Sequence, residues 1–294
     1  VKGPRLNTML AYFNQVSFLF MMFASLCYMA VSALGGPRLF LLLLAIVWLV
    51  VPIVFAFHYR SVLCRVGKWI FSRRYDVRVD TMAPLEVKEP ILVLPNHPAM
   101  VDPMLVGAEL WKRPVKPLSD ELFLNRGGIS ARVLKTLGCV KVPDLRKHRS
   151  KEGARLARSL QDVVTGALEK GDDVIFYPSG HIWTSPHEEI GTRQLAYTVC
   201  RALPPGVRVV AIRTHGLWGS IWSRRGRDSS PAFGWTLMRS VLLWLFVAPF
   251  TPRRVVTMHV EDVTERVKAW ATLTRLEFNR KLEDWYNEGN DEEA

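Results

Sequence analysis

The stretch Val93-Leu94-Pro95-Asn96-His97-Pro98-Ala99-Met100-Val101-Asp102-Pro103 decides how the rest of the chain is interpreted. An apolar run from Ile91 to Leu94 predicts a buried strand, which Pro95 ends. The polar turn that follows holds a histidine and, five residues later, an aspartate, before Pro103 opens a predicted helix. The stretch therefore predicts a strand, a turn and a helix.

His97 and Asp102 have two interpretations at this point. A histidine near its ordinary pKa of about 6.5 can take a proton from a hydroxyl when a carboxylate fixes its tautomer. Pro98 and Pro103 restrict the backbone on both sides and would hold such a pair in place. In the other interpretation, His97 caps the turn and Asp102 caps the following helix. Spacing alone leaves both open.

Composition restricts the class of protein. The 294-residue chain is 49% apolar and carries a net charge of +12, a combination that fits an anionic membrane surface or a nucleic acid. The basic residues cluster beside apolar segments and no nucleic-acid-binding motif is present, so we expect lipid and no nucleic acid. The four cysteines are widely spaced without a CxxC pair, which argues against a disulfide framework and for a reducing compartment.

Two apolar segments begin the chain. Residues 9–34 and 39–57 carry no charge, each is long enough to cross a bilayer, and a Gly35-Gly36-Pro37 turn joins them. They predict an N-terminal transmembrane hairpin, with buried core helices as the alternative. Basic residues flank both ends of the hairpin: Lys2, Arg5, Arg60, Arg65, Lys68, Arg73 and Arg74. This distribution places both ends, and the domain that follows, on the cytoplasmic face. Residues 1–75 form the predicted anchor with its basic juxtamembrane segment.

Residues 76–280 are predicted to form the cytoplasmic domain. Short strands alternate there with amphipathic helices, which indicates an α/β fold with a mostly parallel sheet flanked by helices. The expected strands are 91–94, 115–118, 139–142, 174–177, 207–213 and 255–260. The clearest helix covers 149–170 and stops at Gly171. Working groups of such sheets collect beyond the carboxyl ends of the strands, where His97 falls. Residues 281–294 read as an acidic tail or linker.

A third apolar stretch covers 233–250. Arg239 interrupts it, and only 13 uncharged residues separate that arginine from Arg253-Arg254, too few to span a bilayer. We expect an interfacial or re-entrant helix on the same membrane leaflet, with a buried helix as the second interpretation. Arg253-Arg254 would suit lipid phosphates.

Two further stretches place polar residues and glycines at strand ends. One opens with Lys116-Pro117-Leu118 and reaches Gly138, and the other is Tyr177-Pro178-Ser179-Gly180-His181. Together with Asn96-His97 and Asp102, their order and spacing resemble the motifs of the glycerolipid and lysophospholipid acyltransferase family, from Ile91 to about Ser220.

The resemblance implies roles for single residues. His97 would be the general base for the hydroxyl of a lysolipid, and Asp102 its orienting partner. Asp144 stands where the family usually has a phosphate-binding arginine, so Lys141 or Arg146 would substitute for it, and Ser179 stands where the family has glutamate. The substrate-binding residues implied in this way are Asn96, Lys116, Lys141, Arg146, Pro178, Ser179, Gly180 and His181.

The residues that differ from the family motifs resemble one branch of the family. Residues 177–181 and 213–220 look like the branch of acyltransferase domains that is fused to acyl-carrier-protein or acyl-CoA synthetases and is associated with 2-acylglycerophosphoethanolamine. The resemblance implies a membrane-bound acyltransferase that uses acyl-CoA or acyl carrier protein as co-substrate and no cofactor. Its partners would be membrane lipids, a lysophospholipid acceptor, the acyl carrier and a fused or associated synthetase.

Other interpretations of the same residues remain. A lipid hydrolase would use His97 and Asp102 to activate water, and a non-catalytic membrane-anchoring module would use neither. Backbone N–H groups near Gly180 or at the helix start after Asp102 are candidate oxyanion donors. The spacing of His181, His187 and His215 fits no standard metal site, so we expect no metal.

Overall fold

The computed structural model describes residues 60–120, 138–142, 151–246 and 250–290, with a few single positions outside these ranges. The chain divides into two compact units, Val1–Leu63 and Cys64–Ala294, and the second contains the described fold. The predicted hairpin lies outside the described residues, apart from the single helical positions Ser25 and Met29. Within the described part of the chain, no helix has the length and apolarity needed to cross a membrane.

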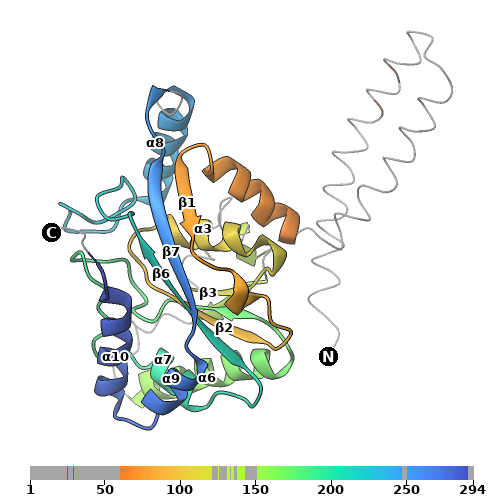
Figure 1. The fold of residues 1–294 in the computed structure, drawn as a ribbon, viewed down its shortest axis with the longest axis vertical. Helices are drawn as coiled ribbons and strands as arrows, with labels where there is room; N and C mark the ends of the chain where they lie inside the picture. Colours follow the sequence, from red (N-terminus) through yellow and green to blue (C-terminus); the bar gives the residue numbers. More distant parts are fainter. Residues whose placement is uncertain are drawn as a thin grey trace. The chain divides into compact units, whose positions relative to one another are not determined.

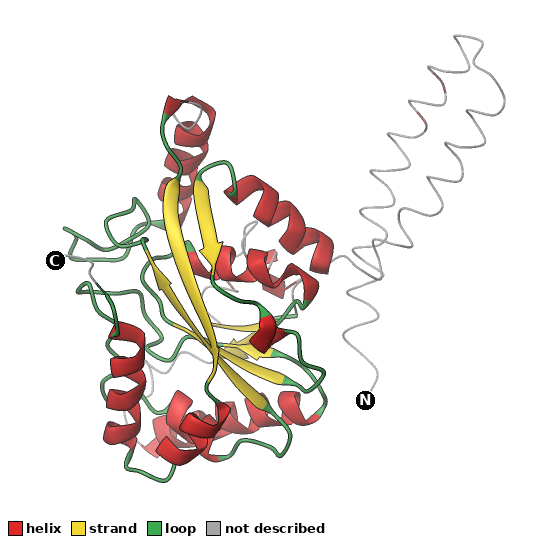
Figure 2. Cartoon of the chain, viewed as in Figure 1, coloured by secondary structure: helices red, strands yellow, loops and turns green. Residues whose placement is uncertain are grey.

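A seven-stranded sheet forms the centre of the described unit (Figures 1 and 2). Its strands are β1 (Tyr75–Val79), β2 (Ile91–Pro95), β3 (Lys116–Asp120), β4 (Val140–Val142), β5 (Val174–Ile175), β6 (Arg208–His215) and β7 (Arg254–Asp262). They lie in the order β1-β7-β6-β2-β5-β3-β4. Neighbours are parallel except β6 and β7, which are antiparallel. The α/β architecture with a mostly parallel sheet is therefore confirmed.

The β2 strand shows why the sheet needs cover on both faces. All of its residues are buried, and alternate side chains point to opposite faces, as strand geometry requires. Leu92 and Leu94 join one hydrophobic core, whereas Ile91 and Val93 join the other.

Helices cover the two faces. The core around Leu92 and Leu94 is closed by α6 (Lys151–Glu169), α7 (Leu195–Arg201), α9 (Thr264–Trp270) and α10 (Arg275–Asn287). The opposite core is closed by α3 (Asp102–Glu109) and by the end of a helix over residues 60–71. Two short 3-10 helices, η1 (Ala83–Leu85) and η2 (Leu110–Lys112), lie in connections. The remaining helix, α8 (Phe233–Phe246), projects beyond the end of the sheet where β7 begins (Figure 1).

The expected strands and the long helix are present. Each of the six expected strands corresponds to one of β2 to β7, and the helix expected over 149–170 is α6. The sequence analysis missed β1 at the edge of the sheet. Its apolar residues alternate with Asp76 and Arg78, which pair with each other on the surface. An edge strand of five residues with two charges carries a weak apolar signal.

The expectation of a tail from residue 281 is corrected by α10. This helix continues to Asn287 and begins with a capping box between Thr274 and Glu277. Its buried side chains recur at helical spacing and belong to the core: Phe278, Leu282, Trp285 and Tyr286. Charged residues between them dilute the pattern, which is why composition suggested a tail.

Candidate active site

The turn after β2 brings two titratable side chains together. Nδ1 of His97 lies 2.9 Å from Oδ2 of Asp102. The Asp102 side chain is fully buried, whereas that of His97 is 16% exposed. An ionised carboxylate only accepts hydrogen bonds, so Nδ1 carries the hydrogen and Nε2 presents a lone pair. The pair therefore has the arrangement of a general base and its orienting carboxylate.

Asn96 fixes the backbone in front of His97. Its side-chain amide donates to the Thr214 carbonyl at 3.0 Å and accepts from the Thr214 N–H at 2.7 Å. These two bonds tie the turn after β2 to the end of β6, the neighbouring parallel strand. Both side chains are buried, so the link is rigid and holds His97 at the carboxyl edge of the sheet.

Asp102 is held by the turn as well as by His97. Its Oδ2 accepts a hydrogen bond from the Ala99 N–H at 3.3 Å. The N-cap position of α3 is Val101, and no side chain caps this helix. Asp102 therefore faces the histidine and the turn, and the interpretation of Asp102 as a simple helix cap is wrong.

The electrostatics of the pair follow from burial. Burial acts to lower the pKa of His97, but the charge and hydrogen bond of Asp102, followed by the charge of Glu188, outweigh it and raise this pKa. Burial raises the pKa of Asp102, and His97 opposes that rise. His97 thus helps Asp102 to stay ionised inside the protein, and Asp102 helps His97 to accept a proton.

Tyr177 covers the histidine ring. The two rings lie 4.4 Å apart between centroids and are tilted by 35°. Burial, and then the charge of Asp102, raises the pKa of Tyr177 well above its usual value, so the phenol stays protonated. The neutral hydroxyl places an additional hydrogen-bond donor near the buried aspartate.

Glu188 is a site residue that the sequence analysis missed. Its Oε2 accepts the His97 backbone N–H at 2.8 Å and the indole N–H of Trp183. The side chain of Asn287 in α10 holds its backbone on both sides, at 2.8 and 3.1 Å. Burial raises the pKa of Glu188, and hydrogen bonds from the His97 backbone N–H and from Trp183 counter that rise. A second carboxylate therefore supports the main chain of the catalytic candidate.

The turn after β5 lies against His97. The Trp183 N–H donates to the His97 carbonyl at 2.9 Å, which joins the two turns. Ser179 and His181 bond within the turn, since the Ser179 hydroxyl donates to the His181 carbonyl at 3.0 Å. The His181 ring nitrogen lies 2.8 Å from the Ser179 carbonyl. Of the expected substrate-binding residues, the structure brings Asn96, Pro178, Ser179, Gly180 and His181 to this edge of the sheet.

Other expected binding residues lie elsewhere. Lys116 begins β3 and pairs with Asp172, and its register with Val174 places it at the amino-terminal end of the parallel strands, opposite His97. Lys141 lies in β4 beside Ser119, and nothing is described of its side chain. Arg146 lies outside the described residues. The structure does not bring Lys116 to the dyad.

Two of the expected oxyanion donors are already engaged. The Gly180 N–H donates to the Tyr177 carbonyl at 3.0 Å, in a turn where glycine adopts a φ of +64°. At the start of α3, the Met104 N–H donates to the Val101 carbonyl. In the part of the chain that the structure describes, no three His, Cys, Asp or Glu side chains are arranged to hold a metal ion.

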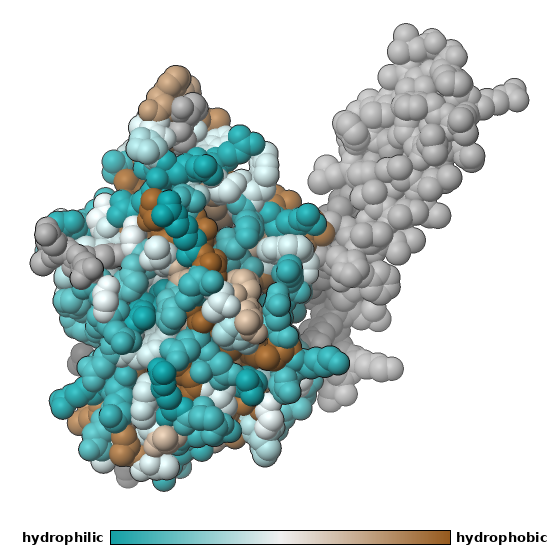
Figure 3. Space-filling model, in the orientation of Figure 1, coloured by the Kyte–Doolittle hydropathy of each residue, from teal (hydrophilic) through white to brown (hydrophobic). Residues whose placement is uncertain are grey.

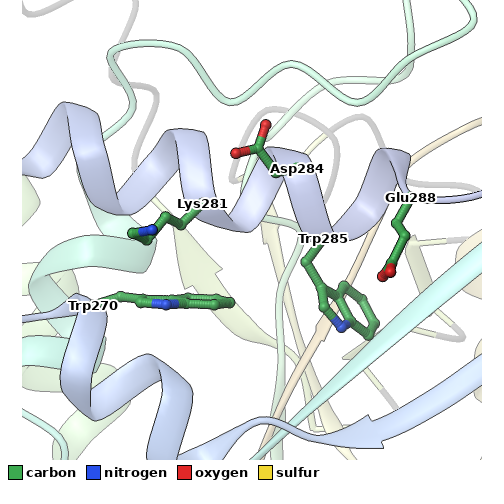
Figure 4. Close-up of a pocket in the computed structure, with 5 residues that line it drawn as sticks. All are labelled: Trp270, Lys281, Asp284, Trp285 and Glu288. Carbon is green, nitrogen blue, oxygen red and sulfur yellow. The ribbon is translucent and has the colours of Figure 1, made fainter.

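A surface hollow is separate from this site. It has a volume of about 390 Å³ and lies between α9 and α10, with the Lys281 side chain above the ring of Trp270 (Figure 4). Its lining residues are Trp270, Lys281, Asp284, Trp285 and Glu288. None of them contacts His97 or Asp102 by a described hydrogen bond, so we assign the hollow no part in the chemistry.

The chain is similar to known proteins in its sequence and in its fold. A family model described as Acyltransferase matches residues 61–216, which is more than half of the 294-residue chain. A search of curated proteins found no match. Among solved structures, the 1-acyl-sn-glycerophosphate (LPA) acyltransferase PlsC from Thermotoga maritima is similar, with 14% identity, a TM-score of 0.43, and coverage of 90% of this chain and 94% of that chain.

Proposed function

Because this chain belongs to the acyltransferase family, we propose that it transfers a fatty acyl group from acyl-CoA or acyl carrier protein to the free hydroxyl of a lysophospholipid. The observation that carries the proposal is the buried contact between His97 and Asp102 at the carboxyl edge of the sheet. His97 lies inside the residues that the family model matches, as does Asp102.

The reaction needs no nucleophile from the protein. Nε2 of His97 accepts the proton of the lysolipid hydroxyl while its oxygen attacks the thioester carbonyl carbon. The tetrahedral intermediate then expels the thiolate, which takes the same proton back from the imidazolium. Asp102 stabilises that imidazolium without being protonated itself. The Ser179 hydroxyl, in the turn after β5, donates to the His181 carbonyl and is not held as a nucleophile.

The partly exposed ring of His97 suits this assignment. Its side chain is 16% exposed, so a hydroxyl from outside can reach it, whereas Asp102 is closed off from water. Exclusion of water from the carboxylate strengthens its interaction with the imidazolium. The difference in exposure between His97 and Asp102 supports acyl transfer between two bound substrates.

The remaining features of the proposal concern the place of the reaction. We assign residues 9–34 and 39–57 to a membrane anchor, with the described unit on the cytoplasmic face, because of the uncharged segments and the basic residues around them. We also assign the chain to the branch fused or associated with acyl synthetases, on the residues after β5 and β6.

The test is acyl transfer in detergent micelles with labelled acyl-CoA and acyl carrier protein against a panel of lysophospholipids. Labelled diacyl phospholipid from the wild type, lost in His97→Ala, is the expected result and identifies the acceptor. Labelled free fatty acid without an acceptor would instead establish a lipid hydrolase. If a folded preparation forms neither product, the chain is a non-catalytic anchoring module.

A further inference from the structure

α8 is an apolar helix that the fold does not bury. Of its fourteen residues, only Thr236 is buried. Its exposed large apolar side chains are Trp235, Leu237, Met238, Val241, Leu242, Leu245 and Phe246, with Phe250 following at 86% exposure. A helix that is apolar on all sides is stable when buried in a protein core or in lipid. The interpretation of this segment as a buried helix is therefore wrong, and the exposed surface needs an occupant.

A second apolar patch lies beside the base of α8. Val66, Trp69 and Ile70 are exposed on the helix over 60–71. The end of that helix is joined to the segment after α8, because Arg253 donates to the Ser72 carbonyl at 3.2 Å and Arg74 donates to the Pro252 carbonyl at 3.0 Å. We call these exposed side chains of α8, Phe250 and the three residues of the 60–71 helix the α8 surface. Figure 3 shows apolar surface, in tan and brown, at the top of the view, where α8 projects.

Positive charges outnumber negative ones in the sequence around α8. Between Arg224 and Arg254 the sequence holds six arginines and a single acidic residue, Asp228. Arg239 on α8 and Arg253 after it are exposed, and Arg73 lies over the exposed ring of Trp69 at 5.0 Å. Apolar side chains surrounded by arginines match a bilayer interface, where acyl chains lie behind anionic phosphates. A protein partner of ordinary composition would not require this excess.

The base of α8 adjoins the catalytic turn. Phe233 packs on Trp222, with ring centroids 5.9 Å apart. The Trp222 carbonyl accepts the Met100 N–H at 3.1 Å, inside the turn between His97 and Asp102. A surface that docks at α8 therefore lies next to the site.

From these observations we propose that the α8 surface inserts into the lipid of a bilayer, as a membrane contact separate from the N-terminal segments. Fourteen residues make about 21 Å of helix, less than the roughly 30 Å hydrocarbon core, so α8 enters one leaflet. Neither the surface nor its occupant depends on the acyltransferase activity proposed above, and α8 lies outside the residues that the family model matches.

The test is photo-crosslinking of the full chain on liposomes. A benzophenone amino acid replaces Leu242 or Leu245, and the matched control carries it at Leu276 of α10, which is exposed to a similar degree: 48%, 50% and 55% respectively. The liposomes contain equal parts of phosphatidylcholine and phosphatidylglycerol, or phosphatidylcholine alone. We expect lipid adducts at Leu242 and Leu245, more on the anionic liposomes, and on the order of tenfold fewer at Leu276.

Three results would overturn the proposal. Adducts of doubled mass would show that a second copy of the chain covers the α8 surface. Adducts within one chain would show that another segment covers it. Lipid adducts equal at all three positions would show contact without insertion. Because the readout is a lipid adduct, it is independent of acyl transfer, and a chain with no enzymatic activity would still give a decisive answer.

A second measurement links the surface to turnover. Leu242→Asp combined with Leu245→Asp should reduce transfer to a long-chain lysolipid in a bilayer by about tenfold or more, since two apolar contacts with lipid are lost. Transfer to a short-chain, monomeric lysolipid should stay unchanged, as should both activities in Leu276→Asp. An equal loss with both acceptors would mean that the substitutions act on the fold.

Discussion

The described unit contains two histidine–aspartate pairs that differ mainly in their surroundings. His97 and Asp102 face each other in the turn after β2, and His259 of β7 faces Asp80, just after β1. In each pair Nδ1 points to the carboxylate. The side chains of the first pair are 16% and 0% exposed, whereas those of the second are 42% and 41% exposed. Pairing is therefore common to both, and burial distinguishes them.

The two aspartates respond to these surroundings in opposite directions. Burial raises the pKa of Asp102. At Asp80 burial is slight and also acts to raise the pKa, but hydrogen bonds from the Val260 and Thr81 N–H groups and from His259 outweigh it and lower the pKa. Asp80 is thus stabilised chiefly by two backbone N–H groups, whereas Asp102 relies on His97. A histidine–aspartate pair can act in catalysis when the carboxylate is buried and the histidine ring is still accessible to a substrate.

The largest expected difference between the pairs is the effect of removing each histidine. His97→Ala should lower acyl transfer by about 10²- to 10⁴-fold, the usual contribution of a general base. His259→Ala should leave transfer within about twofold, because its surface pair does not take part in the chemistry. Initial rates with the acceptor found in the panel assay check this. Equal losses in the two variants would remove the distinction between the pairs.

The aspartates should repeat this pattern. Asp102→Asn keeps the shape of the side chain but presents an amide, which permits the wrong histidine tautomer, and should reduce transfer by up to about 10⁴-fold. Asp80→Asn, the matched control, should have near wild-type turnover. Circular dichroism establishes that both variants fold. A fully active Asp102→Asn would show that His97 needs no orienting carboxylate.

Glu188 sharpens the comparison, because it accepts the backbone N–H of His97, whereas the second carboxylate beside His259, that of Glu261, faces the ring at 3.9 Å. Glu188→Gln retains an oxygen for the His97 N–H but removes the charge that helps raise the His97 pKa. We expect about a tenfold loss of turnover and a pH profile displaced to lower pH. Glu189→Gln, whose side chain accepts from Ser185 on the surface, should change neither quantity. A lower rate with an unmoved profile would indicate a purely structural role.

The smallest effect should come from the surface pair itself. Asp80 has a lowered pKa, so its stabilisation of the fold is complete above its ordinary pKa of about 3.9 and is lost as the pH falls through its folded value. Asp80→Asn should therefore lower stability by no more than about 1 kcal/mol at neutral pH and by nothing in strong acid. Urea unfolding at pH 7 and pH 3 measures both. A difference that does not become smaller between pH 7 and pH 3 would have another cause.

The residues of the site differ in how far the sequence could predict them. His97 and Asp102 are five positions apart on a strand, turn and helix, so local rules place them together. Glu188 is 91 residues from His97 and reads locally as part of a charged loop. Its burial depends on Asn287 in α10, a contact that no short-range pattern encodes.

The elements of the fold also differ in how far the sequence could predict them. The central strands were predictable because they are buried on both faces and read as apolar runs, of which Ile91 to Leu94 is the clearest. The edge strand β1 and the helix α10 were missed, because their charged residues face solvent and mask the apolar positions. Lys116 was expected at the site by motif, but it lies at the other end of its strand, since parallel register and not motif order fixes its place.

The most direct test of the central claim, that neutral His97 held by buried Asp102 is the base, is the pH dependence of acyl transfer in the wild type, His259→Ala and Asp102→Asn. The base form is required, so the rate rises with pH through the His97 pKa. That pKa is raised, so the wild type and His259→Ala should share a midpoint above about 6.5. Asp102→Asn should have a lower midpoint in its residual activity. A wild-type midpoint below 6.5, or one that moves in His259→Ala and not in Asp102→Asn, would contradict the claim.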